Sequence, residues 1–290
     1  MKQKTAPLCV LGAGILWGTM GIFVRHLQSR GLSSLEIGTL RTLMGVLITG
    51  IYLFLRHRSL LKIRLKDLWC FLGTGIASLF FMNLTYFTAM QHTSLAVAGV
   101  LLYTAPIFVM LLSAALFREK ITRKKLLALA LAFFGCVLVS GLGTDSRVSL
   151  PGLLFGLGAG ISYALYSIFG RYAIRRGYGS WTMTFYTFLF CSVLNVFLCD
   201  WQLVLPIAAE PVELLWIVAL GLVTAFGPYV LYSLGLESMD NGRASILASI
   251  EPVVAAIISV VVFREALSLT AALGIALVLS AILILSKKDR

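Results

Sequence analysis

Charged residues are scarce in this sequence. Only 12% of its 290 residues are Asp, Glu, Lys or Arg, against about 25% in a typical soluble domain. Hydrophobic residues make up 59% of the chain. A chain of this composition cannot expose all of its segments to water, which excludes a soluble globular protein. It predicts an all-α integral membrane protein.

Motifs for nucleotide or metal chemistry are also missing. The sequence has no GxxxxGK[ST] phosphate loop, which argues against a process driven directly by ATP. Its five cysteines show no paired metal-ligand spacing, so we expect small buried hydrophobic side chains at Cys9, Cys70, Cys136, Cys191 and Cys199. No ionisable residues cluster at one depth, as they would in an intramembrane enzyme. We therefore expect no enzyme, no cofactor and no metal site.

Long apolar runs fill most of the chain instead. Polar breaks divide it into ten segments, most of them near the 20 or so residues that a helical span needs. The N-terminal run lacks a small-residue cleavage site and is predicted to stay as the first span. The predicted spans are 7–26, 35–55, 67–90, 95–117, 125–142, 151–170, 181–199, 212–235, 244–263 and 269–286.

The positive charges lie mainly between alternate spans. If the N-terminus is cytoplasmic, 19 of the 24 Lys and Arg residues fall inside, and only Arg25, Arg30, Arg147 and Arg264 fall outside. This asymmetry predicts that both termini are cytoplasmic. The net charge of +12 is then a topology signal, helped by anionic lipid, and does not indicate nucleic-acid binding.

The two halves of the sequence resemble each other at an offset of 146 residues. "GAGILWGTMGIFVR" (12–25) aligns with "GAGISYALYSIFGR" (158–171), with seven of fourteen positions identical. At the same offset 98–119 aligns with 244–265, so that Pro106 meets Pro252 and the two "FRE" triplets coincide. We predict two duplicated units, 1–144 and 145–290, with five spans each.

An odd number of spans per unit places the second unit upside down in the membrane relative to the first. Such an inverted repeat puts a substrate site near the midplane, between the halves, and suits alternating access to the two sides. The simpler alternative is that duplication only built a stable bundle.

Three motifs resemble a known family. "LWG" (16–18), "LRTLMG" (40–45) and above all "GRASILASIEPVVAAIISVVVFRE" (242–265) are similar to the ten-span drug/metabolite transporter superfamily, and within it to the EamA-type exporters. The resemblance covers nearly the whole chain. It implies two inverted five-helix repeats, a central cavity, and transport of amino acids or other small metabolites, usually outward.

Two features mark the predicted ninth span. Glu251 is the only acidic residue well inside a predicted span, where a carboxylate costs about 2.5–3.5 kcal/mol on translocon scales. Pro252 and its counterpart Pro106 remove a backbone hydrogen bond at matching depths, so we expect hinges there. Glu251 is a candidate to bind a substrate amine or a transported proton, or to be a neutral structural acid.

Arg41, a few residues inside the second span, is the natural opposite charge. It is a second candidate for proton coupling, unless it extends outward to the interface. The sequence does not decide whether Arg41 and Glu251 pair.

Aromatic and glycine residues complete the expected site. The offset pairs Trp17 with Tyr163 and Tyr86 with Tyr232. Aromatic rings can cover an apolar substrate or contact an ammonium group, although they are also common at lipid-facing and core positions. GxxxG patterns at Gly14–Gly18 and Gly152–Gly156–Gly160 predict close helix packing. The predicted substrate-binding residues are Trp17, Asn83, Tyr86, Tyr103, Tyr163, Tyr232 and Glu251.

Together these features predict a secondary transporter that exports a small metabolite, an amino acid or related compound, across a bacterial cytoplasmic membrane. The expected partners are this solute and membrane lipid, in a monomer or homodimer. An uncoupled facilitator, or a drug or amine efflux protein, is the nearer alternative. A lipid scramblase is the more distant one.

Overall fold

A computed structural model describes residues 5–141 and 149–286, and all regular structure in these two ranges is helical. The predicted boundary between the units, at 144 and 145, lies outside the described residues. So do six of the basic residues used to predict topology: Lys2, Lys4, Arg147, Lys287, Lys288 and Arg290.

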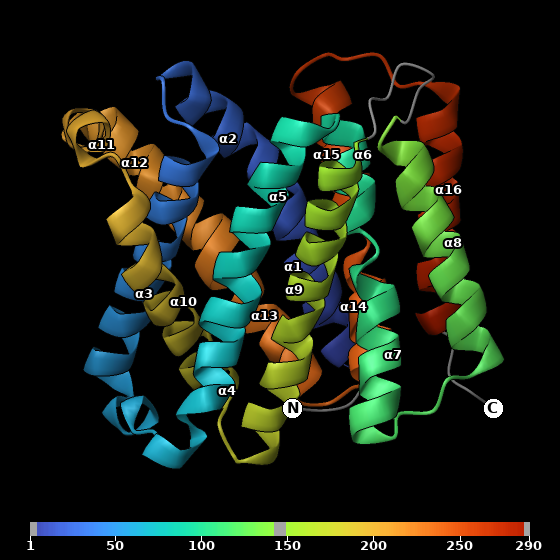
Figure 1. Ribbon diagram of the computed structural model, residues 1–290, viewed down its shortest axis with the longest axis horizontal. Coiled ribbons are helices and arrows are strands. Elements are labelled where there is room, and N and C mark those ends of the chain that lie inside the picture. Colours follow the sequence, from blue (N-terminus) through green and yellow to red (C-terminus); the bar gives the residue numbers. More distant parts are fainter. Residues whose placement is uncertain (1–4, 142–148, 287–290) are drawn as a thin grey trace.

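Five spans form the first half of the bundle (Figure 1). The first consists of α1 (Ala6–Gly18) and α2 (Met20–Ser29), and the second is α3 (Ser34–Arg56). The short 3₁₀ turns η1 (Arg58–Leu61) and η2 (Leu65–Asp67) lead to the third span, which contains α4 (Leu68–Leu72), the π-helical segment η3 (Gly73–Phe80) and α5 (Phe81–His92). The fourth span is α6 (Leu95–Leu102) with α7 (Ala105–Phe117), and the fifth is α8 (Arg123–Val139).

The second half repeats this order. It contains α9 (Leu150–Arg175), α10 (Ser180–Leu198), the short connecting helix α11 (Trp201–Ala208), and a composite span of α12 (Pro211–Leu220), the π-helical η4 (Gly221–Phe226) and α13 (Gly227–Leu236). The ninth span is α14 (Asn241–Ala248) with α15 (Glu251–Val261), and the tenth is α16 (Leu269–Ser286).

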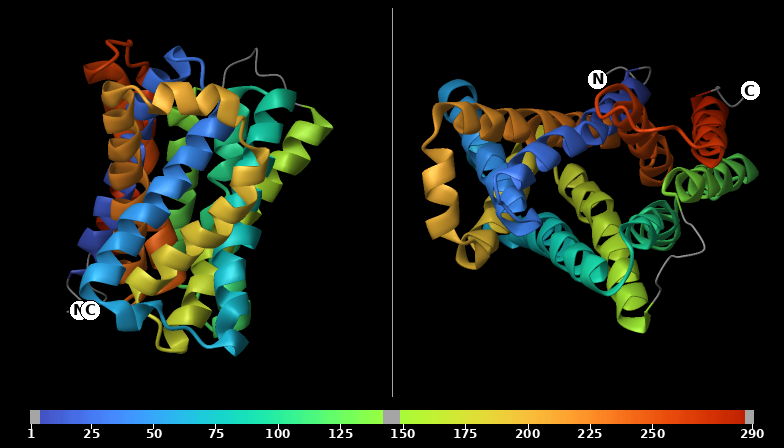
Figure 2. Two further views of the ribbon diagram at one scale, coloured as in Figure 1. Left: turned by 90° about the vertical axis from the view of Figure 1, so that its left-hand side faces the viewer. Right: turned by 90° about the horizontal axis from the view of Figure 1, so that it is seen from above.

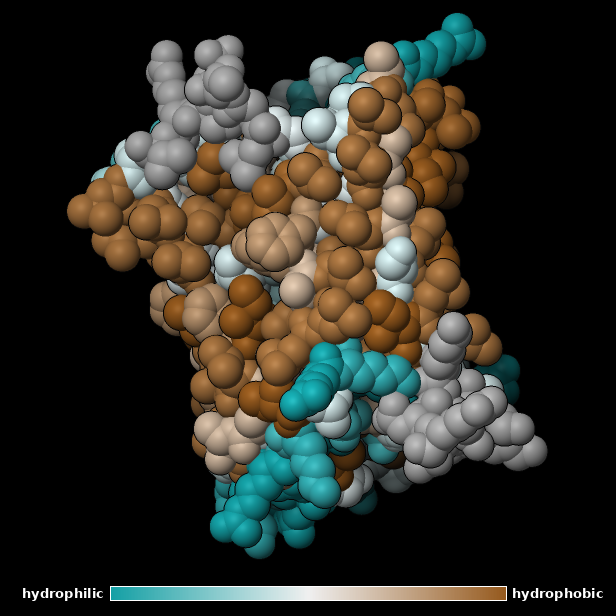
Figure 3. All heavy atoms as spheres, turned by 90° about the vertical axis from the view of Figure 1, so that its right-hand side faces the viewer, coloured by the Kyte–Doolittle hydropathy of each residue, from teal (hydrophilic) through white to brown (hydrophobic). Residues whose placement is uncertain are grey.

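The expected membrane-spanning architecture is confirmed. In the described part of the chain, nine helical stretches are long and apolar enough to cross a membrane. The helix α8, with 17 residues, occupies the predicted fifth span and packs along α16 at one edge of the bundle (Figure 2). Hydrophobic side chains cover the middle of one face of the molecule, and hydrophilic ones gather at its lower end (Figure 3), as expected for a protein with a lipid-facing belt.

Equivalent helices of the two halves run in opposite directions. In Figure 1, α1 rises from the lower end whereas its counterpart α9 descends toward it. The lower end also carries the basic connections α3–α4, α7–α8 and α9–α10, as well as the start of α1 and the end of α16. We call this the basic end, and the other the opposite end.

The fourth and ninth spans are both interrupted just before their prolines. The helix stops at Leu102 and resumes at Ala105 in one span, and stops at Ala248 and resumes at Glu251 in the other. The two interruptions coincide at the 146-residue offset. The chain therefore breaks where proline lacks the N–H that would continue the helix.

Glycines allow other helices to approach these breaks. A Cβ on Gly14 of α1 would lie 2.4 Å from Ile250 Cγ2 and 3.0 Å from the Ala248 carbonyl oxygen. Its repeat counterpart Gly160, on α9, would place a Cβ 2.5 Å from Thr104 Oγ1. Each break is thus held against a glycine of the other half, which is the close packing that the GxxxG patterns predict.

Candidate functional site

A small cavity lies between the two broken spans, inside the bundle. Space for the centre of a water molecule measures about 20 Å³, whereas one water needs roughly 10–15 Å³. In this conformation the cavity therefore holds about one water and must widen to accept a metabolite. Its walls are Tyr103, Ala105, Pro106, Val109, Tyr163, Ser167, Tyr232, Ser245, Ala248, Ser249 and Glu251.

The cavity lies where the two repeats meet. Ala105 and Glu251 are equivalent positions at the 146-residue offset, and both line it. Tyr103 and Ser249 form a second equivalent pair in its wall. The site is therefore geometrically symmetric and chemically asymmetric, because one half supplies a carboxylate and the other a methyl group at the same place.

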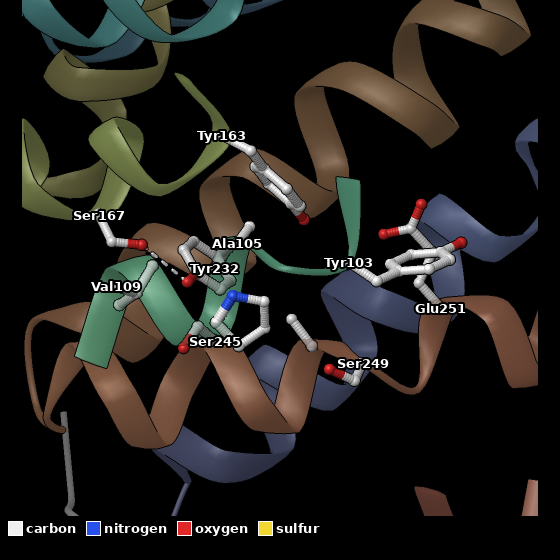
Figure 4. A pocket seen from close by; sticks show the side chains of 11 residues that line it. Tyr103, Ala105, Val109, Tyr163, Ser167, Tyr232, Ser245, Ser249 and Glu251 are labelled. Carbon is white, nitrogen blue, oxygen red and sulfur yellow. Dashed lines mark hydrogen bonds between the residues drawn. The ribbon is translucent and has the colours of Figure 1, made fainter. Parts of the chain in front are cut away.

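Polar and aromatic side chains line the cavity on both of its sides (Figure 4). Tyr103 and Glu251 lie on one side, and Ser167 and Tyr232 lie on the other, where their hydroxyl oxygens are 2.9 Å apart in a hydrogen bond. The Glu251 carboxylate has no hydrogen-bond or ion-pair partner among the described residues. An acid left unpaired in an apolar interior is costly.

An aromatic layer backs the cavity. The Trp17 ring on α1 packs edge-on against Tyr229, with ring centroids 5.3 Å apart, and lies 5.5 Å from the ring of Tyr232 and 6.5 Å from that of Tyr163. Tyr166 extends the layer, 5.2 Å from Tyr229, and its hydroxyl bonds Ser233 at 2.7 Å. The rings that face the cavity are therefore held in place from behind.

Arg41 is buried nearby but forms no ion pair with Glu251. The Nη1 atom of Arg41 lies 3.3 Å from Met20 Sδ, and its Nε has no hydrogen-bond partner in the described part of the protein. A buried guanidinium with an unsatisfied N–H has capacity to accept an anionic group.

The structure brings together some of the predicted site residues. Tyr103, Tyr163, Tyr232 and Glu251 line one cavity, together with the predicted hinge residue Pro106, whereas Pro252 follows directly after Glu251. Three other predicted binding residues do not form its wall. Trp17 stands behind it, Tyr86 lies outside its wall, and Asn83 has a buried Nδ2 atom without a hydrogen-bond partner in the described part of the chain.

Sequence reasoning missed the three serines of the cavity, Ser167, Ser245 and Ser249. One signal was available for Ser249, because it is the repeat counterpart of Tyr103. Among the described residues, no group of three His, Cys, Asp or Glu side chains is arranged to hold a metal ion. The site can hold an ammonium group, exchange a proton at Glu251 and hydrogen-bond a polar solute.

Comparisons with known proteins agree with this architecture. A model of the EamA-like transporter family matches residues 4–141 and again residues 150–287. The chain is 32% identical to a protein of Archaeoglobus fulgidus described as an uncharacterized transporter, over 97% of this chain and 96% of that protein. It is 28% identical to the uncharacterized transporter YwfM of Bacillus subtilis, over 100% of this chain and 96% of that protein. A solved crystal structure with 21% identity has the same fold, with a TM-score of 0.79 over 97% of this chain and 96% of that one.

Proposed function

Because the chain belongs to the EamA-like transporter family, we propose that it is a secondary transporter that exports an amino acid or a related small metabolite by alternating access. One observation carries this proposal: the unpaired Glu251 carboxylate lies in a cavity between two broken, repeat-related spans. Discontinuous helices that meet near the midplane are the usual way in which transporters bind a solute between repeats.

The breaks supply the movement in this proposal. Pro106 and Pro252 are the second residues of α7 and α15, which begin directly after the non-helical residues 103–104 and 249–250, so each half-helix can tilt about its break. Tilting one pair of half-helices opens the cavity to one end, and tilting the other pair opens it to the opposite end.

The charges suggest how an amino acid would lie. Its ammonium group would meet Glu251, with the faces of Tyr103 and Tyr163 contributing cation–π contact. Its carboxylate would turn toward Arg41, whose guanidinium is buried without an anionic partner. This arrangement leaves neither buried charge uncompensated when the substrate is bound.

Proton coupling follows from the same acid. A carboxylate that holds either a proton or a substrate ammonium, but not both, exchanges one for the other between the two sides of the membrane.

The decisive experiment measures solute flux into proteoliposomes together with the pH of the lumen. We expect Glu251→Gln to abolish or uncouple flux, whereas Asp200→Asn, which removes an exposed acid at the opposite end and keeps a side-chain oxygen to cap α11, leaves both signals intact. Full flux with unchanged proton movement in Glu251→Gln would refute the coupling role.

The same vesicles separate the alternatives. An uncoupled facilitator moves solute without changing the luminal pH. An amine or drug efflux protein, which the single carboxylate and its aromatic neighbours also suit, transports cations that lack a carboxylate and tolerates the loss of Arg41. A scramblase moves fluorescent lipid and no solute.

A further inference from the structure

Each end of the bundle carries an arginine and a glutamate from opposite halves, related by the internal repeat. At the opposite end, Arg25 Nη1 of α2 lies 2.7 Å from Glu265 Oε1, in the loop after α15. The Arg25 guanidinium also sits 4.0 Å from the centroid of the Phe263 ring. This contact ties the first span to the end of the ninth.

The counterparts at the basic end are Arg171 and Glu119. Here Asn241, the first residue of α14, connects the two. Its backbone N–H donates to Glu119 Oε1 at 3.1 Å, and its side-chain Oδ1 accepts from Arg171 Nε at 3.0 Å. Glu119 Oε2 also accepts from the N–H of Gly242 at 3.3 Å.

Asn241 links the wall of the central cavity to a surface hollow at the basic end. It is fully buried, and its Nδ2 donates to Ser113 Oγ and to the Ser167 carbonyl oxygen, both at 3.2 Å. Ser167 lines the cavity, whereas Arg171 lines a surface hollow together with Asp240. A solute that leaves toward the basic end must therefore displace the Asn241 hydrogen bonds.

A second repeat-related pair flanks each contact. Arg30 Nε lies 3.3 Å from Glu213 Oε1 at the opposite end, and Arg176 Nε lies 2.8 Å from Asp67 Oδ1 at the basic end. Each pair joins a residue of one half to a residue of the other. Both ends therefore share these two repeat-related pairs, and they differ at Asn241, whose repeat counterpart is the apolar Leu95.

We infer that Arg25–Glu265 and Arg171–Asn241–Glu119 are two latches that close opposite ends of the transport path and open in alternation. The inference rests on the alternating access proposed above. Asn241 is a positioning residue in this scheme, because it controls entry without touching the substrate in the cavity.

Thiol labelling tests the latches without requiring any substrate. A reporter cysteine is introduced by Ser245→Cys, in the cavity wall, after the native cysteines have been replaced. A membrane-impermeant reagent is then applied from either side of reconstituted vesicles. We expect Asn241→Ala to raise the labelling rate from the basic end about tenfold, the effect of losing one or two buried hydrogen bonds, and to lower it from the opposite end.

Glu265→Gln should do the reverse, raising labelling from the opposite end. Exchanging the charges, Arg25→Glu with Glu265→Arg, should return labelling toward the unmodified protein. Arg118→Gln and Arg264→Gln are matched controls, since these exposed loop arginines are also repeat counterparts, and both should leave labelling unchanged. If Asn241→Ala does not fold, Arg171→Gln weakens the same latch and must give the same pattern.

The inference is overturned if folded latch variants label like the controls, or if labelling rises from both ends at once. If labelling alternates between the two ends as expected but no solute is transported, the proposed function is refuted and the latch inference is still supported.

Discussion

Glu251 and Ala105 show how one residue makes a symmetric site chemically asymmetric. Both line the cavity from equivalent places in a duplicated span, and only one of them ionises. Duplication supplies the backbone break in both halves, and a single substitution then supplies the charge. In the proposed function, the aromatic rings beside Glu251 would distinguish an ammonium group from a neutral solute.

Tyr163 tests this role of the rings. Tyr163→Ala should raise the KM for transport about tenfold, close to the ~1.4 kcal/mol expected of a desolvated cation–π contact. Tyr163→Phe keeps the ring and should stay within about twofold of the unmodified protein. The measurement is initial flux against substrate concentration, and equal effects of the two variants would contradict the prediction.

Glu265 leads to a prediction about pH. The hydrogen bond from Arg25, and then that from Ser259, holds the pKa of Glu265 below its ordinary value. A lowered pKa means that the ion pair is present above the ordinary carboxyl pKa and is lost only as pH falls through the lowered one. Labelling of Ser245→Cys from the opposite end should therefore be flat from about pH 8 to about pH 5.

An exposed cysteine at Gln202→Cys corrects those rates for the reagent's own dependence on pH. A rise in corrected labelling within this range would show that Glu265 does not hold the latch. A flat profile would assign any pH dependence of flux in the same range to groups other than this pair.

At the scale of helices, the breaks and the glycines that face them form one device in each half. Proline sets where the helix stops, and a glycine of the other half fits against the exposed backbone. The sequence predicted the interruptions at the prolines, the close packing at the glycines, and the limits of the fourth and tenth spans. It could do so because hydropathy, proline chemistry and glycine spacing act locally.

Other features of the helices could not be predicted. The π-helical η3 and η4 occupy overlapping places in the two halves, but the i→i+5 pattern has no composition that marks it. The break at Thr19 between α1 and α2 has no counterpart in the continuous α9. The rotation of each helix decided which aromatic residues face the cavity, and rotation depends on contacts between spans that lie far apart in sequence.

Gly160 tests the packing at a break. Gly160→Val should destabilise the protein by about 1–3 kcal/mol, because its Cβ would meet Thr104 and the Leu101 carbonyl oxygen. Gly21→Ala, where an added Cβ meets nothing within 4 Å, should leave stability equal or slightly higher. Thermal unfolding in detergent gives the comparison, and equal melting temperatures would argue against tight contact at Gly160.

At the scale of the whole molecule, the loops rich in basic residues are gathered at one end of the bundle. The loops rich in lysine and arginine share the end at which α1 starts and α16 stops, which the charge asymmetry of the sequence predicted as one side. Asn241 was beyond sequence reasoning at this scale, because an asparagine at a helix start is an ordinary turn residue until its partners on α7 and α9 are seen.

The orientation in the membrane can be checked directly. Following the positive-inside rule, Lys62→Cys in the basic end should be labelled by an impermeant reagent only after cells are permeabilised. Gln202→Cys, on α11 at the opposite end, should be labelled in intact cells. The reverse pattern would place the termini outside and reverse the direction of the proposed export.

The two latches differ in their contact with water, so the ionic strength of the solution affects them differently. The Arg25 and Glu265 side chains are 51% and 47% exposed, so dissolved ions reach their charges and screen the attraction between them. Asn241 is buried inside the protein, and its bonds to Ser113 Oγ and to the Ser167 carbonyl oxygen are neutral and therefore insensitive to screening. Rising ionic strength would therefore loosen the end that is closed by Arg25 and Glu265 more than the end that is closed through Asn241, so that the resting conformation responds mainly to the salinity of one compartment.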